Sequence, residues 1–72
     1  MDAFTKAIRR RLCTKAHPED GAVAGHFVYN ALMAECSGDL LEVAVQLERL
    51  LDDGVLRRMP TGGFALSDVL PR

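Results

Sequence analysis

The densest group of charged side chains is the run Arg9, Arg10 and Arg11, with Lys6 one helical turn earlier. Guanidinium groups keep their charge and form paired hydrogen bonds to phosphate or carboxylate oxygens. The run therefore indicates a contact with phosphates or with an acidic protein surface. The alternative is a solvated helix face, with ion pairs to the acidic residues at 19–20.

Two cysteines and two histidines could bind a metal or take part in redox chemistry: Cys13, Cys36, His17 and His26. Their spacing lacks the closely spaced ligand pairs of a zinc site, so we expect no metal. Nearby cations make a thiol more reactive, so a redox role for Cys13 competes with a passive apolar one. We expect Cys36 to be buried, His17 to mark a helix boundary and His26 to be half-buried.

Residues for catalysis are missing from the sequence pattern. No nucleophile, base and acid stand in a recognisable set, and the glycines at 62–63 lack the lysine and the following helix of a phosphate-binding loop. A chain of 72 residues also offers little room for a substrate pocket. We predict a protein that is not an enzyme and that has no cofactor and no small-molecule substrate.

Size and composition favour one small globular domain spanning 1–72, with 49% hydrophobic and 26% charged residues. Such a chain buries a modest core, so a homodimer would add useful buried surface. The net charge of −1 is unlike that of a strongly basic DNA binder. No apolar run is long enough to cross a bilayer and the N-terminus lacks the order of a signal peptide, which predicts a cytoplasmic location.

Three helices are expected. The first spans about 3–15, with Asp2 as its N-cap and with Phe4, Ile8 and Leu12 in a buried stripe. The second spans about 18–36, because Pro18 suits the first turn of a helix. The glycines at 21 and 25 weaken its beginning, which leaves a start as late as residue 22 open.

The third helix is expected over 40–53, between an N-cap at Asp39 and a stop at Gly54. Glu42 stands three residues after Asp39, so we expect it to bond back to the Asp39 N–H in a capping box. The predicted core face of this helix comprises Leu40, Val43, Ala44, Leu47, Leu50 and Leu51. A hairpin follows over 55–67, with strands at 55–59 and 64–67, and Phe64 and Leu66 facing the core.

Three consecutive segments resemble a winged helix-turn-helix domain: Asn30 to Arg49, Gly54 to Arg58, and Met59 to Phe64. Ala34 corresponds to the small residue where the two helices touch, and Gly38 to the glycine of the turn. The resemblance covers nearly the whole chain. It implies a mainly α fold of three helices with a C-terminal β-hairpin, the wing.

The resemblance also implies DNA binding, because the third helix of such domains enters the major groove. Transferred to this chain, Arg49 would pair with guanine and Gln46 with adenine, while the other cations bind the phosphate backbone. The implied DNA-binding residues are Gln46, Arg49, Arg57, Arg58, Lys6, Arg9 and Arg10. The protein would then be a small DNA-binding transcription-type regulator, acting as a dimer on duplex DNA.

The charges on the third helix support a different function. Leu41 and Val45 would be exposed apolar residues beside Glu42 and Asp52, and the wing tip has no lysine or arginine. Apolar residues surrounded by charge are typical of protein contacts. The alternative hypothesis is therefore a winged-helix protein-docking module, an adaptor or inhibitor of another protein, and the sequence leaves both hypotheses open.

Overall fold

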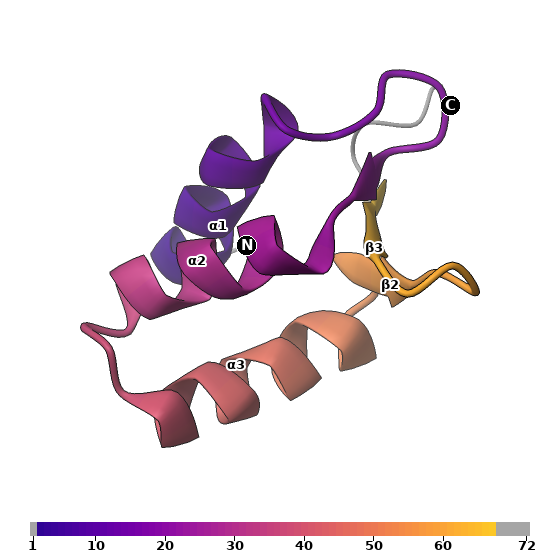
Figure 1. The fold of residues 1–72 in the computed structure, drawn as a ribbon. Helices are drawn as coiled ribbons and strands as arrows, with labels where there is room; N and C mark the ends of the chain where they lie inside the picture. Colours follow the sequence, from indigo (N-terminus) through magenta and orange to yellow (C-terminus); the bar gives the residue numbers. More distant parts are fainter. Residues whose placement is uncertain (1, 68–72) are drawn as a thin grey trace.

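The computed structural model describes residues 2–67, which form three helices and a small antiparallel sheet. The elements in chain order are α1 (Ala3–Cys13), β1 (Ala22–Val23), α2 (Gly25–Glu35), α3 (Leu40–Asp52), β2 (Leu56–Arg58) and β3 (Phe64–Leu66). The strands lie in the order β1-β3-β2. In Figure 1, α2 lies between α1 and α3, and the sheet lies at one end of the helices. The predicted mainly helical fold with a C-terminal hairpin is confirmed, whereas β1 is an addition to it.

α1 begins where predicted, because Asp2 caps it. Its Oδ1 accepts a hydrogen bond from the backbone N–H of Thr5 at 2.8 Å. Ile8 and Leu12 are buried, as their spacing predicted. The helix ends at Cys13, two residues earlier than predicted. The next N–H groups form a tighter 3₁₀-type turn, in which the N–H of Lys15 donates to the carbonyl of Leu12 at 2.9 Å.

The second helix begins at Gly25, so the start predicted at Pro18 is wrong. The preceding residues form a closed loop instead. The N–H of Gly21 donates to the carbonyl of His17, and the N–H of His17 donates to the carbonyl of Ala22, both at 2.8 Å. These bonds turn the chain back on itself, which a helix starting at Pro18 would prevent.

β1 explains why this loop is needed. Val23, predicted as a helix residue, is a buried strand residue paired with Phe64 of β3. Gly21 just before it has φ +73°, and a Cβ at Gly21 would lie 2.6 Å from the carbonyl oxygen of Leu66. Only glycine fits this approach of two backbones, so the loop and the sheet edge depend on each other.

The turn between α2 and α3 follows the prediction. Gly38 has φ +78°, and its N–H donates to the carbonyl of Met33 at 3.0 Å, closing the end of α2. Asp39 caps α3, since its Oδ1 accepts from the N–H groups of Leu41 and Glu42 at 3.1 and 3.2 Å. The end of α2 and the start of α3 therefore both find hydrogen-bond partners within this short turn.

The rotation of α3 about its own axis differs from the prediction. Its buried residues are Val43, Leu47 and Leu50, so Leu40 and Ala44 are exposed and do not belong to the core. Leu40 is 71% exposed. On α2, Ala34 is also exposed and is not the residue where the helices touch. The stripe of buried side chains is narrower than the sequence pattern indicated.

The C-terminal hairpin forms as predicted. Gly54 ends α3 with φ +77°, and β2 and β3 pair with Arg57 opposite Ala65. Phe64 and Leu66 are buried against the helices. The buried apolar core comprises Ile8, Leu12, Val23, Val28, Ala31, Leu32, Cys36, Val43, Leu47, Leu50, Leu56, Phe64 and Leu66. None of the helices in residues 2–67 has the length and apolar character needed to span a membrane.

Candidate functional site

One side of α3 carries two apolar side chains followed by two carboxylates. Leu41 and Val45 are 76% and 52% exposed, which confirms the prediction for both residues. Glu48 and Asp52 are also exposed, one and two turns further along. Spacings of four, three and four residues place all four on the side opposite the buried residues. These four residues are called the α3 face below.

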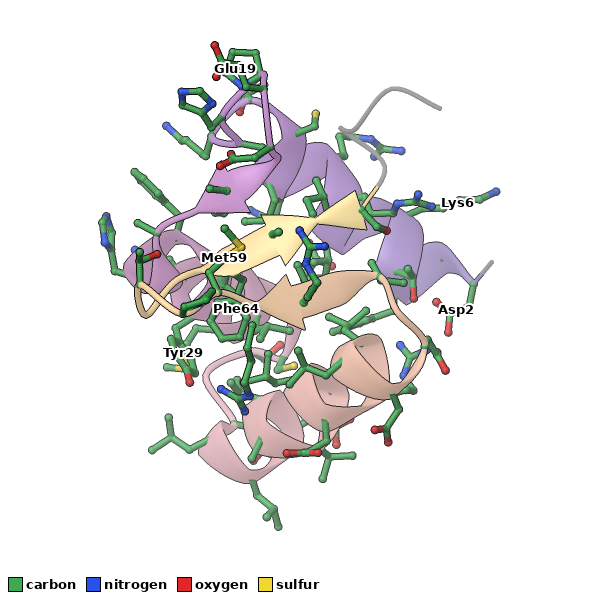
Figure 2. The ribbon with its side chains drawn as sticks, turned by 90° about the vertical axis from the view of Figure 1, so that its right-hand side faces the viewer. Asp2, Lys6, Glu19, Tyr29, Met59 and Phe64 are labelled. Carbon is green, nitrogen blue, oxygen red and sulfur yellow. The ribbon has the colours of Figure 1, made fainter. Side chains whose placement is uncertain are left out.

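Exposed apolar side chains are concentrated rather than scattered. Of the large apolar residues that are exposed within residues 2–67, Leu40, Leu41 and Val45 lie in the first half of α3. The other is Tyr29 of α2, whose ring meets the ring of Phe64 edge-on at 6.3 Å, and Figure 2 shows these two side chains near each other. The first half of α3 is therefore the most apolar part of the described surface.

Arg49, predicted to reach DNA bases, is held at the contact between α1 and α3. Its guanidinium donates to Asp2 Oδ2 at 3.0 Å and lies 3.8 Å from a carboxylate oxygen of Asp53. Its Nε–H donates to Gln46 Oε1 at 2.8 Å, and the group lies 5.6 Å from the centre of the Phe4 ring. These contacts engage Nε and one Nη of the guanidinium and hold it beside Asp2.

Gln46 and Glu42 belong to the same row of hydrogen bonds. The Gln46 Nε2 donates to Glu42 Oε1 at 2.7 Å. The predicted return bond from Glu42 to the Asp39 N–H is wrong, because that N–H donates to the carbonyl of Cys36 at 3.1 Å. Glu42 and Gln46 thus continue the network of Arg49 along the edge of α3.

Asp2 receives hydrogen bonds from two elements. Those from Thr5, and next the positive charge of Arg49, hold the pKa of Asp2 below its ordinary value. The same carboxylate therefore caps α1 and binds α3, as a charged acceptor.

The two arginines of the wing lie on β2, and both are exposed. Arg58 stands opposite Phe64 in the strand register, and its guanidinium lies 5.7 Å from the centre of the Phe64 ring. Arg57 stands opposite Ala65. Successive residues of a strand point to opposite faces of the sheet, yet both arginines border the same depression beside α3.

An open depression of about 540 Å³ lies on the surface where α3 meets the sheet. Glu48 borders it on the helix side, and Arg57 and Arg58 border it on the strand side. Its other lining residues are Leu51, Gly54, Leu56, Ala65 and Ser67. The depression thus lies between Glu48 of the α3 face and the two arginines of the wing.

The cations of α1 have separate surroundings. Lys6 and Arg10 are exposed, and Lys6 points away from the body of the protein in Figure 2. Arg11 pairs with Glu35 of α2 at 2.6 Å, and not with the acidic residues of the following loop as the alternative expected. Arg9 is half-buried. The predicted DNA-binding residues are thus divided among the α1–α3 contact, β2 and the outer side of α1.

The cysteines and histidines do not form a site. Cys13 is exposed and Cys36 is buried, as predicted, and burial raises the pKa of the Cys36 thiol. The N–H of Glu19 donates to His17 Nδ1 at 3.2 Å, which fits a loop position. His26 is exposed, not half-buried as predicted. Within residues 2–67 no three side chains of His, Cys, Asp or Glu are grouped to hold a metal ion.

Comparison with known proteins adds no family. The sequence matches no protein-family model, and no curated protein and no solved structure matches the chain.

Sequence reasoning missed two features of this region. The contact of Asp2 with Arg49 joins residues 47 positions apart, and no local pattern signals it. Glu48 was also overlooked, although it stands seven residues after Leu41 and therefore on the same side of the helix.

Proposed function

We propose that this protein has a winged helix-turn-helix fold and binds another protein through the α3 face. The helix pair α2 and α3, joined by a short turn and followed by the β2–β3 hairpin, supports this fold assignment. The chemistry of the α3 face supports protein binding.

The observation that carries the proposal is the arrangement of Leu41 and Val45 with Glu48 and Asp52. The two aliphatic side chains are adjacent on the helix and mostly exposed, and carboxylates follow them. A small apolar patch beside charged groups is typical of protein contacts. The same face repels a phosphate backbone, because DNA affinity depends largely on cations that replace counterions.

The position of Arg49 strengthens this argument. It is the only cation in α3, and it is bound to Asp2 at 3.0 Å. Moving this guanidinium outward to a base would break the ion pair and the bond to Gln46. A protein partner that binds the α3 face leaves the network intact.

Capture experiments with two matched variants test the proposal. Wild-type protein, Val45→Asp and Thr61→Asp are immobilised and exposed to a lysate of the source organism, and the bound proteins are quantified by mass spectrometry. Both substitutions add one carboxylate at an exposed position, but Thr61 lies in the wing loop. A partner is then purified and its affinity measured for each variant.

We expect Val45→Asp to weaken the affinity for the partner roughly tenfold or more, because a charge replaces an apolar side chain that the complex would bury. Thr61→Asp should bind like the wild type. Equal affinity for Val45→Asp and wild type would show that the α3 face is not the docking site.

Duplex DNA is the second candidate partner, and the exposed cations on α1 and β2 are the observation that favours it. Lys6, Arg10, Arg57 and Arg58 are all exposed. Binding to random-sequence duplex DNA across a salt titration should then weaken steeply as salt rises. Arg57→Ala should lower the slope by about one, and Arg49→Ala should lower affinity if α3 reads bases. No binding at low salt would remove this candidate.

A further inference from the structure

The charges of this small chain are separated between two helices. Residues 2–15 contain five lysines and arginines and one carboxylate, whereas residues 39–53 contain five carboxylates and one arginine. The overall charge of −1 conceals this separation. The basic segment at 2–15 is therefore complementary in charge to the acidic segment at 39–53.

The outer side of α1 matches the α3 face in spacing as well as in charge. On α1, Ala3 and Ala7 are followed three residues later by Arg10. On α3, Leu41 and Val45 are followed three residues later by Glu48. Both helices thus present two apolar side chains and then a charge, at equal intervals and with opposite signs.

Size is complementary too. Ala3 and Arg10 are exposed and Ala7 is half-buried, so the α1 side presents small methyl groups beside long cationic side chains. Small residues on one helix allow larger side chains of another to approach closely. Leu41 and Val45 are the larger partners, and the aliphatic stems of Lys6 and Arg10 can cover them while the charged ends reach carboxylates.

The two surfaces cannot meet within one molecule. α2 lies between α1 and α3 in Figure 1, and the Lys6 side chain points away from the body of the protein in Figure 2. Only the start of α1 reaches α3, through the contacts of Asp2 and Phe4 with Arg49. Contacts between helices reflect this order, with α1 packed on α2 and α2 packed on α3. Their complementarity can be satisfied only between two copies.

We infer that the α3 face of one molecule binds the outer side of α1 of a second copy, with the two helices parallel. In this register Ala3 lies opposite Leu41, Ala7 opposite Val45, and Arg10 opposite Glu48. The contact is head-to-tail, so a dimer keeps one free α1 side on one copy and one free α3 face on the other, and assembly continues. This inference rests on the proposed use of the α3 face and names a second copy of this chain as the partner.

A single pair of helices makes a small interface, so the association is weak and depends on charge. Sedimentation velocity over a concentration series is the test, in about 20 mM and about 500 mM salt, because the higher salt screens exposed charges. Three proteins are compared: the wild type and two blocked variants. Lys6→Glu/Arg10→Glu reverses the charge of the outer side of α1 and so blocks that surface. Val45→Asp places a charge in the apolar part of the α3 face and so blocks that face. Glu19→Arg is the control, because it changes charge in an exposed loop outside both surfaces.

At low salt the wild type and Glu19→Arg should grow beyond dimers as concentration rises, and high salt should weaken association roughly tenfold or more. Each blocked variant alone should remain monomeric. An equimolar mixture of the two blocked variants should form a 1:1 dimer that grows no further. The unchanged α3 face of Lys6→Glu/Arg10→Glu binds the unchanged α1 of Val45→Asp, and no second pair of surfaces remains. Circular dichroism checks that both variants keep the helical fold.

A wild type that stays monomeric at low salt and high concentration would overturn the inference. So would a self-associating wild type whose blocked variants fail to form a mixed dimer, because that result requires a symmetric contact. If the wild type is monomeric but Val45→Asp still loses a partner from the lysate, only the identity of the partner is wrong. The docking role of the α3 face would then stand.

Discussion

α1 and α3 obey the same local rules but present opposite surfaces. Each begins at an aspartate whose carboxylate accepts backbone N–H bonds, and each buries residues spaced three and four apart. The outer side of α1 is cationic, whereas the α3 face is apolar and acidic. Folding constrains the inner side of a helix strongly and the outer side weakly. The difference between the outer sides therefore carries the information on function.

The two caps also differ, although both are aspartates. Asp39 binds two N–H groups of its own helix. Asp2 binds one N–H of α1 and also the Arg49 guanidinium of α3. A cap can thus be purely local or can join two helices, and the sequence pattern is the same in both cases.

The inner sides should be equally sensitive to truncation. Ile8→Ala in α1 and Leu50→Ala in α3 each remove a fully buried side chain, at 0% exposure. Each should lower the free energy of unfolding by about 2–5 kcal/mol, because the lost burial and the cavity add together. Urea denaturation measures the change, with Leu41→Ala as the exposed control. A loss below about 1 kcal/mol at either site would contradict the described core.

The caps should differ in cost. Asp39→Ala should lower the free energy of unfolding by about 0.5–2 kcal/mol, the usual range for a lost N-cap. Asp2→Ala should cost more than Asp39→Ala, because Arg49 also loses a partner. Asp2→Asn keeps a capping side chain but loses the charge, so it separates the two contributions. Equal costs for the two alanine variants would show that the Arg49 contact adds no stability.

Acid should act on the α1 cap through Asp2. The folded pKa of this group is lowered by Thr5 and Arg49, so the folded state favours its charged form. Its contribution to stability is present above the unfolded pKa, near 4, and is lost as pH falls through the folded pKa. The stability difference between wild type and Asp2→Asn, measured by urea denaturation from about pH 6 to pH 3, should therefore shrink toward acid. A difference that is constant with pH would assign no role to the charge.

Changes on the outer sides should have the smallest effect on stability. Val45→Ser in α3 and Arg10→Ser in α1 should each alter the free energy of unfolding by less than about 0.5 kcal/mol, because neither side chain is buried. Both should weaken self-association in the sedimentation experiment. A large loss of stability at either position would show that these surfaces are packed within a single molecule.

Local signals predicted the elements that depend on local chemistry. Asp2 and Asp39 mark two helix starts, and Gly38 and Gly54 mark two helix ends, at which each glycine has positive φ. These rules work because a cap or a left-handed turn needs only its neighbours along the chain. Burial of Phe64 was predicted for the same reason, since alternation in a hairpin is a local pattern.

The prediction failed where distant residues decide. β1 has only two residues and is a strand because it pairs with β3. A segment this short has no sequence periodicity that could predict it. Without β1, the prediction extended α2 back to Pro18. Leu40 and Ala44 were assigned to the core because they fit a helical stripe, but the packing of α3 on α2 fixed which side faces inward.

The sequence by itself determined that this chain forms three helices, two of them capped by aspartates, and a hairpin, and that Leu41 and Val45 would be exposed beside acidic residues. Local hydrogen bonding and the spacing of apolar side chains suffice for both statements. Only the tertiary structure decided that Arg49 binds Asp2 instead of facing outward, because that ion pair joins opposite ends of the sequence. It also placed α1 and α3 on either side of α2, with contact between them at the start of α1. Such placements depend on how whole elements pack, and spacing along the chain does not encode them.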